Sequence, residues 1–124
     1  MKLKSEVVEK LEAFSLFESE TEFEQHMEGW LQQVRHDLSR GEMMALQMLM
    51  QFSKTVPGVC HEEIGHMLEA IRKEVDCLGI SRATFKRMRR KANALGIFSV
   101  YETARKDGSR DCNLYVFHHY PHFI

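Results

Sequence analysis

The stretch from Ser81 to Leu95 concentrates positive charge, because six of its fifteen residues are Lys or Arg and none is Asp or Glu. Exposed helix faces usually mix the two signs, since Glu and Lys one turn apart stabilise a helix. Like charges at this density repel each other unless an anion lies against them. The stretch therefore predicts an anion-binding surface, and an ordinary solvated helix face is the alternative.

The charge of the whole chain hides this asymmetry, since the formal net charge is only −1. Residues 1–80 contain 8 Lys and Arg against 15 Asp and Glu, whereas residues 81–124 contain 9 against 3. A basic part joined to an acidic part is typical of a protein that turns one surface toward an anionic partner such as nucleic acid. We expect the acidic part to face away from that partner.

Helical spacing divides the basic stretch into two faces. Ser81 is a good N-cap, and Gly96 suits the left-handed position after a helix. The stripe predicted to face the core consists of Phe85, Met88, Ala92 and Leu95. The opposite side and its flanks carry Arg82, Ala83, Lys86, Arg87, Arg90 and Asn93. In the major groove of DNA, Arg or Lys can pair with guanine and Asn with adenine, and each of these cations can neutralise a phosphate.

A second basic feature follows at a predicted β-hairpin. The runs "IFSVYET" (97–103) and "CNLYVFH" (112–118) read as strands, and Asp107-Gly108 between them is a strong hairpin-turn signal. The tip of this hairpin carries Arg105, Lys106 and Arg110, which can reach phosphates or a minor groove. An ordinary exposed turn that is basic by chance is the alternative interpretation.

Helices are predicted for most of the chain before residue 80. Apolar residues at helical spacing predict a first helix within residues 1–15 through Leu3, Val7, Leu11 and Phe14. A capping box of Thr21 and Glu24 is predicted to begin the next helix. Its apolar stripe consists of Phe23, Met27, Trp30, Val34 and Leu38.

The middle of the chain predicts two further helices. Ser39 and Glu42 form another capping box, and "KTVPGVC" ends the helix that they begin. Ile64, Leu68, Ile71 and Val75 mark the fourth helix, which stops near Gly79. A helix, a short glycine-containing turn and a second helix form a helix-turn-helix, in which the second helix enters the major groove. We therefore expect a mainly α (α+β) fold, a winged helix-turn-helix with a C-terminal hairpin wing and two additional N-terminal helices.

The run "LGISRATFKRMRRKANALGIFSVYETARKDGSRDCNLYVF", taken with "GEMMALQMLMQFSKTVPGVCHEEI", resembles the winged helix-turn-helix proteins of Gram-positive bacteria, their plasmids and their phages. The resemblance covers roughly residues 40–118. It implies double-stranded DNA binding in regulation or replication control. It places Ser81, Arg82, Thr84 and Arg87 on the recognition-helix motif, and Arg105, Gly108 and Asn113 on the wing.

Nothing in residues 1–40 carries this resemblance, so we divide the chain into an N-terminal helical extension (1–38) and a DNA-binding domain (39–124). The apolar residues of the extension, among them Phe14, Phe23 and Trp30, exceed what a small winged helix needs. They predict a homodimer through the N-terminal helices, with capping of the domain's own core as the alternative. A third possibility is that this acidic arm recruits another protein or restrains the basic helix.

Other chemistries find little support in the sequence. Seven His and three Cys are present, but neither H-E-x-x-H nor C-x-x-C occurs, and His61 and His66 are five residues apart. We therefore expect no metal and no cofactor. The sequence also contains no G-x-S-x-G motif and no P-loop, so we expect no enzymatic activity. No apolar run reaches the ~18–20 residues needed to span a bilayer, and the first residues do not resemble a signal peptide, so a cytoplasmic protein is expected.

The function expected from these observations is sequence-specific binding of double-stranded DNA by a transcriptional regulator. One alternative is a DNA-binding protein of plasmid or phage replication or maintenance. The other is an adaptor whose winged helix docks on an acidic protein.

Overall fold

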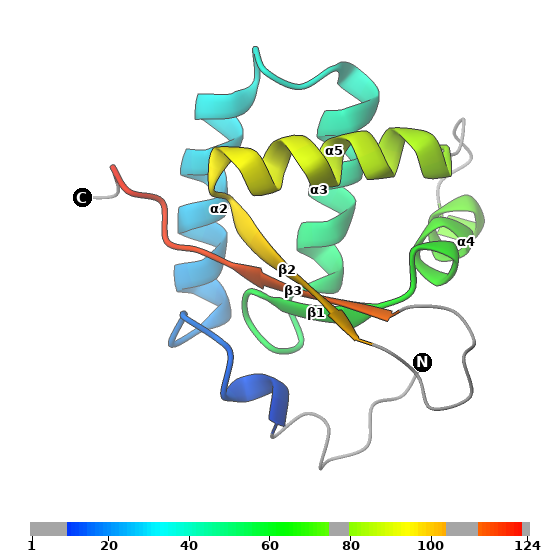
Figure 1. The fold of residues 1–124 in the computed structure, drawn as a ribbon. Helices are drawn as coiled ribbons and strands as arrows, with labels where there is room; N and C mark the ends of the chain where they lie inside the picture. Colours follow the sequence, from blue (N-terminus) through cyan, green and yellow to red (C-terminus); the bar gives the residue numbers. More distant parts are fainter. Residues whose placement is uncertain (1–9, 75–79, 104–111, 123–124) are drawn as a thin grey trace.

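The computed structural model describes residues 10–74, 80–103 and 112–122. A short helical stretch at residues 10–12 comes first. The longer elements follow in the order α2 (Glu20–Val34), α3 (Arg40–Phe52), β1 (Val59–Glu62), α4 (Ile64–Glu74), α5 (Arg82–Leu95), β2 (Phe98–Thr103) and β3 (Cys112–Phe117) (Figure 1). The predicted mixture of helices with a short sheet is confirmed.

Helix α2 begins two residues earlier than its predicted capping box. Its N-cap is Ser19, whose hydroxyl accepts a hydrogen bond from the Glu22 backbone N–H, so the prediction of a cap at Thr21 with Glu24 was wrong. The sequence contains both S-x-x-E and T-x-x-E at this point, and the earlier start adds helical hydrogen bonds such as Phe23 N–H to Ser19 O. Acidic residues then occupy the first turn, where the helix dipole favours them.

Helices α2 and α3 run antiparallel beside each other, and α5 crosses α3 (Figure 1). The predicted capping box of α3 is confirmed by two hydrogen bonds. Glu42 N–H donates to Ser39 Oγ over 3.2 Å, and Ser39 N–H donates to Glu42 Oε1 over 2.8 Å. The sequence therefore specifies locally where α3 starts.

Helix α5 has the predicted ends, with Ser81 as N-cap and Gly96 in the left-handed conformation at φ 87°. The inward positions Phe85, Met88 and Ala92 are buried as predicted. Leu95 was predicted to join them but is 39% exposed. It lies at the edge of the stripe in the last residue of the helix, and after the turn Ile97 is fully buried in its place.

The predicted hairpin is present as β2 and β3, which pair antiparallel with Phe98 opposite Phe117 and Thr103 opposite Cys112. The sheet has a third strand, since β1 pairs antiparallel with β3 in the order β1-β3-β2. The sequence pattern predicts no strand at residues 59–62, which lie in the connection between two predicted helices. A four-residue strand has almost no pattern of its own, and its hydrogen-bonding partners lie more than fifty residues further along the chain.

One core joins the predicted extension to the rest of the chain. Phe23, Met27 and Trp30 of α2 are at most 4% exposed and belong to the same buried cluster as side chains of α3, α5 and the sheet. These are the apolar residues that suggested dimerisation, and their contacts lie within one chain. A dimer stays a prediction, and it would have to use other side chains. Phe14 of the predicted first helix is 47% exposed.

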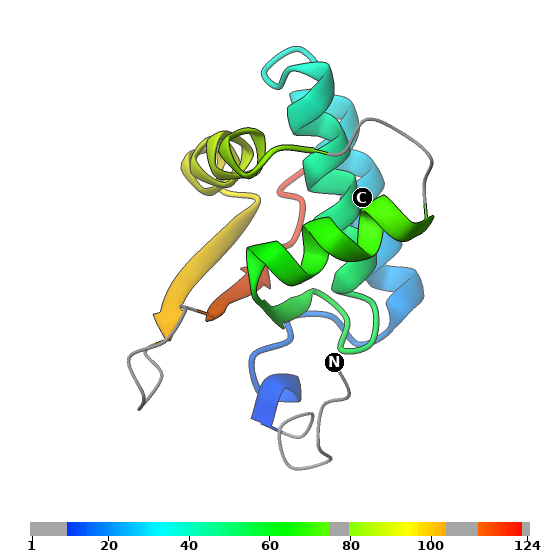
Figure 2. The same cartoon turned by 90° about the vertical axis from the view of Figure 1, so that its right-hand side faces the viewer.

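The C-terminal residues 118–122 lie along α2 (Figure 1). Trp30 Nε1–H donates to the backbone oxygen of His118 over 3.1 Å, and the Tyr120 ring packs on Gly29, where a side chain would leave no room. This segment fastens α2 to the end of β3. The opposite side of the molecule carries α5 and β2, which Figure 2 shows together, away from α2.

Candidate functional site

Three of the predicted contact residues, at the N-terminus of α5, are joined by hydrogen bonds. Ser81 Oγ accepts from the Thr84 backbone N–H over 3.1 Å and lies 2.9 Å from Thr84 Oγ1. Arg87 Nη2 in turn donates to Thr84 Oγ1 over 3.1 Å. Ser81 and Thr84 therefore cap the helix and position Arg87, so their polar atoms are already engaged within the chain.

A buried carboxylate lies under the middle of α5. Glu42 of α3 is 2% exposed, and its Oε1 lies 2.8 Å from Lys91 Nζ while its Oε2 lies 3.6 Å from Arg87 Nε. Burial alone would raise the pKa of Glu42, but the hydrogen bonds from Lys91 and from the Ser39 N–H outweigh it and hold the pKa below its usual value. Glu42 thus remains charged and neutralises part of the charge of α5.

The remaining predicted residues of α5 lie on its exposed side. Arg82, Ala83, Lys86, Arg90 and Asn93 are all exposed. Lys86 and Arg90, one turn apart, form no ion pair with an acidic side chain that the structure describes. Arg82 differs from them because its Nη2 reaches toward Gly65 at the start of α4. Two cations available for an anion therefore lie side by side on one face of the helix.

The predicted hairpin tip, with Arg105, Lys106 and Arg110, lies outside the described residues, and so does Gly108. Asn113, which the resemblance assigned to the wing, lies in β3 and is only 9% exposed. It lines a cavity of about 450 Å³ between α5 and the hairpin, together with Lys86, Arg89, Arg90, Asn93 and Val100. Arg89 was not among the predicted contact residues, although its spacing from Lys86 and Asn93 is that of one helix face.

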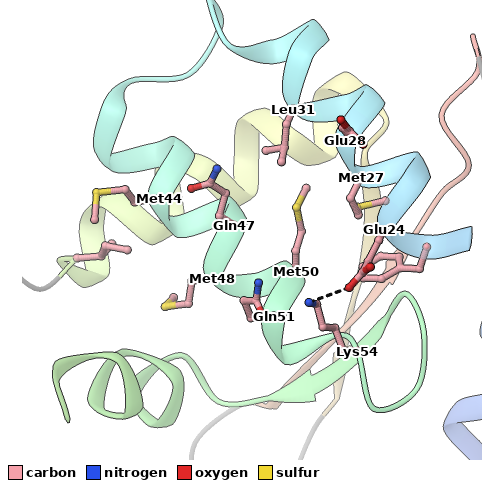
Figure 3. Close-up of a pocket in the computed structure, with 12 residues that line it drawn as sticks. Glu24, Met27, Glu28, Leu31, Met44, Gln47, Met48, Met50, Gln51 and Lys54 are labelled. Atoms are coloured by element: carbon pink, nitrogen blue, oxygen red, sulfur yellow. Dashed lines mark ion pairs between the residues drawn. The ribbon is translucent and has the colours of Figure 1, made fainter. Parts of the chain in front are cut away.

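A second cavity, of about 490 Å³, lies between α2 and α3 (Figure 3). Its walls carry the apolar side chains of Met27, Leu31, Met44, Met48 and Met50. At one end Lys54 Nζ lies 2.9 Å from Glu24 Oε1, so this charged pair is satisfied within the chain. The lining suits apolar contacts better than acid–base or metal chemistry.

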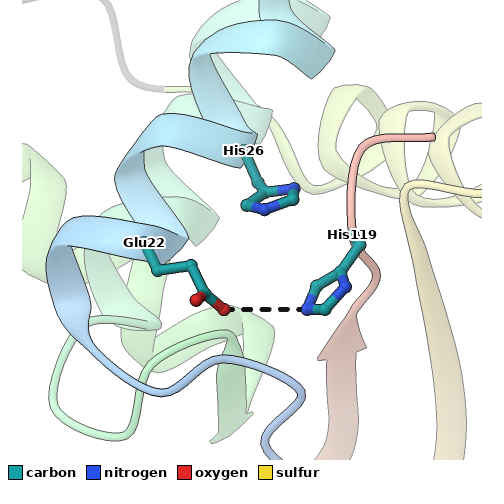
Figure 4. A group of neighbouring side chains, drawn as sticks. All are labelled: Glu22, His26 and His119. Atoms are coloured by element: carbon teal, nitrogen blue, oxygen red, sulfur yellow. Dashed lines mark ion pairs between the residues drawn. The ribbon is translucent and has the colours of Figure 1, made fainter. Parts of the chain in front are cut away.

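Glu22, His26 and His119 form a cluster that was not predicted from the sequence (Figure 4). One potential ligand atom from each lies within 4.8 Å of the others, the only such group of three or more in the described part of the chain. The i, i+4 spacing of Glu22 and His26 is a sequence signal, but the place of His119 depends on the fold. Two of the His and Cys residues for which the sequence predicted no metal site lie elsewhere: Cys60 is buried, and His66 Nδ1 lies 3.5 Å from Glu62 Oε1.

One ring nitrogen of each histidine in this cluster already hydrogen-bonds to the backbone. His26 Nδ1 accepts from the Tyr120 N–H over 2.9 Å, and His119 Nε2 lies 2.5 Å from the Leu16 oxygen and 3.7 Å from Glu22 Oε1. A nitrogen that donates to a carbonyl has no lone pair for a metal. Burial, reinforced by the neighbouring His119, lowers the pKa of His26. The contacts indicate a cluster that holds the C-terminal segment on α2.

Comparisons with protein-family models, curated proteins and solved structures found no match for this chain. Within the described residues, no helix has the length and apolar character needed to cross a membrane.

Proposed function

We propose that this protein is a winged helix-turn-helix transcriptional regulator that binds double-stranded DNA. In this proposal, α5 is the recognition helix. The observation that carries it is the exposed face of α5, where Lys86 and Arg90 have no acidic partner among the described side chains. An exposed helix without an acidic residue and with unpaired cations is suited to a polyanion.

The arrangement of the elements supports this choice. Helices α4 and α5 follow one another against α3, and the β2–β3 hairpin comes directly after α5. A helix, a strand, two helices and a hairpin that pairs with the early strand fit the family that the sequence resembles. Figure 2 shows that α5 and β2 share one side of the molecule, so a duplex could contact both.

The dimensions and chemistry of α5 suit the major groove. A helix of 14 residues is about 21 Å long, and the groove is about 12 Å wide, which admits a helix with its side chains. Lys86 and Arg90 can donate to guanine or to phosphates, and Asn93 can pair with adenine. Arg87 is partly neutralised by Glu42, so we assign it to positioning and to a weaker phosphate contact.

The test is binding to duplexes selected from random DNA, measured by fluorescence anisotropy between 50 and 200 mM salt. Contacts to six or more phosphates lower affinity about 10³-fold or more over this range. The double variant Lys86→Ala/Arg90→Ala should bind at least about tenfold more weakly and with less sequence preference, since one bidentate base contact is worth ~1–3 kcal/mol.

The matched control is Arg35→Ala/Arg40→Ala, which removes the same charge from the ends of α2 and α3. It should bind nearly as well as the parent, because those residues lie on other elements. If both double variants lost the same affinity, only net charge would matter and the groove assignment would be wrong. Failure of the parent to bind any duplex, with retained binding to an acidic protein, would support the adaptor alternative.

A further inference from the structure

The cavity between α5 and the hairpin has the size of a small-molecule site and a lining that is mostly polar and basic. Its volume of about 450 Å³ lies in the range of small-ligand sites. One wall is a face of α5, with Lys86, Arg89, Arg90 and Asn93 at the i, i+3, i+4 and i+7 positions. Val100 of β2 and Asn113 of β3 line it from the hairpin. The cavity is therefore basic on one side and holds an apolar and an amide side chain on the other.

Three cations around one cavity repel each other, and no described acidic side chain pairs with Lys86, Arg89 or Arg90. An anion in the cavity would offset this repulsion. Guanidinium groups bind phosphate through two parallel N–H donors, and an ammonium adds a point charge. The cations therefore favour a phosphate group over a neutral ligand.

Asn113 indicates what the rest of the ligand carries. Its side chain is more than nine-tenths buried, lines the cavity, and has an Oδ1 atom without a hydrogen-bond partner. The buried hydroxyl of Tyr115 also lacks a partner of good geometry, and the Asn113 amide and the Arg89 guanidinium lie close enough to act on it. Buried polar atoms are nearly always hydrogen-bonded, so an unpartnered oxygen on a residue that lines a cavity suits a bound water or a ligand group. Because Oδ1 accepts, a ligand group that met it would donate through a hydroxyl or an amino group.

We propose that this cavity binds a nucleotide. Lys86, Arg89 and Arg90 hold its phosphate, Asn113 accepts from a hydroxyl or amino group of the sugar or base, and Val100 contacts its apolar face. The nucleotide is either a free one or a unit of a DNA strand. Lys86, Arg90 and Asn93 also belong to the proposed DNA-binding face, so a free nucleotide and a duplex would compete. Only the DNA form of this inference rests on the proposed function.

The test uses the intact chain with three probes at about 50 mM salt: adenosine monophosphate, adenosine and inorganic phosphate. Calorimetry measures affinity, and amide chemical shifts locate the site. Adenosine monophosphate should shift resonances of residues 86–93, 100 and 113 and bind at least about tenfold more tightly than adenosine. The double variant Lys86→Ala/Arg90→Ala should lower the affinity for adenosine monophosphate at least about tenfold. Arg82→Ala, which removes a cation directed toward α4, should change its affinity less than about twofold.

Asn113 supplies the sharper variant. Asn113→Ala should lower the affinity for adenosine monophosphate and leave the affinity for inorganic phosphate unchanged. A general loss of folding would lower both affinities. Thermal unfolding checks each variant. The same variants are then measured with duplex DNA.

Each outcome separates the two proposals. Duplex binding sensitive to Asn113→Ala, without binding of free nucleotide, would make the ligand a unit of DNA. Nucleotide binding without duplex binding would refute the proposed function and support this inference. A third outcome is duplex binding that requires Lys86 and Arg90 but is unchanged by Asn113→Ala, together with no binding of adenosine monophosphate. This outcome would overturn the present inference and would still support the proposed function.

Discussion

The carboxylate of Glu42 should be one of the largest single polar contributions to the stability of this protein. It accepts hydrogen bonds from the Ser39 N–H and from Lys91 Nζ, its Oε2 lies 3.6 Å from Arg87 Nε, and the residue is 2% exposed. Glu42→Gln keeps the shape of the side chain and can keep the hydrogen bond from Ser39, but it removes the charge. Hydrogen bonds to charged groups are worth ~1.5–3 kcal/mol, and we expect a loss of about that size.

The partners set an upper limit on this loss. Breaking a fully buried ion pair costs ~3–5 kcal/mol, but the side chains of Lys91 and Arg87 are 47% and 52% exposed, so both cations can regain water. Glu42→Ala should come closer to that range, because it also removes the capping-box hydrogen bond, worth ~1 kcal/mol. In a double-mutant cycle with Lys91→Met, the coupling free energy should be about 1 kcal/mol.

The assay is urea unfolding followed by the fluorescence of Trp30, the only tryptophan and a buried one. The pKa of Glu42 is lowered from its usual 4.5, so its stabilising contribution is complete above that value and is lost as the pH falls through the lowered pKa. The difference between parent and Glu42→Gln should therefore be full at pH 7 and shrink below pH 4.5. A difference that stayed constant down to strongly acidic pH, or a coupling near zero, would refute this account of Glu42.

Three further predictions concern the packing around α2 and the C-terminal segment. Gly58 has φ 78°, and a Cβ there would lie 2.5 Å from the Phe17 ring, so Gly58→Ala should cost roughly 2–4 kcal/mol in urea unfolding; an effect below 1 kcal/mol would contradict the close packing. The lowered pKa of His26 means that the unfolded chain takes up its proton first, so acidification below the usual 6.5 should destabilise the fold by at most about 1.4 kcal/mol per pH unit through this group. His26→Gln should reduce the slope of stability against pH between 7 and 5, and an unchanged slope would exclude His26 as its source. Trp30→Phe leaves the backbone oxygen of His118 without its indole donor and should cost at least ~1 kcal/mol in thermal or urea unfolding, with faster amide exchange at residues 118–120; unchanged exchange would show that this hydrogen bond does not hold the segment.

The elements that the sequence predicted best are those with signals inside a few turns of chain. The Ser39–Glu42 box, the Ser81 cap and the glycine at 96 act on neighbouring backbone groups, so their effect needs no distant partner. Strand β1 is the opposite case, because four residues carry no periodicity and become a strand only by pairing with β3. The Ser19 cap lies between these cases, since two overlapping capping patterns compete within six residues.

The candidate site also has features that local sequence predicts and features that depend on distant contacts. Sequence alone determined that residues 81–95 form a helix with one apolar and one basic face, because helical spacing assigns each side chain to a face. It also determined that the basic charge lies in the C-terminal third of the chain. Only the tertiary structure decided which cations are neutralised, since Glu42 is nearly fifty residues away from Lys91 and meets it when α3 packs under α5.

The tertiary structure also decided the role of Asn113 and of the apolar residues of α2. Asn113 becomes the wall of a cavity only because β3 lies opposite α5, and Trp30 is buried only because α2 packs into the shared core beside the C-terminal segment. The charges and faces of a helix follow from local spacing. The partner of each charge depends on contacts between segments that are distant in the chain, and no short stretch of sequence contains that information.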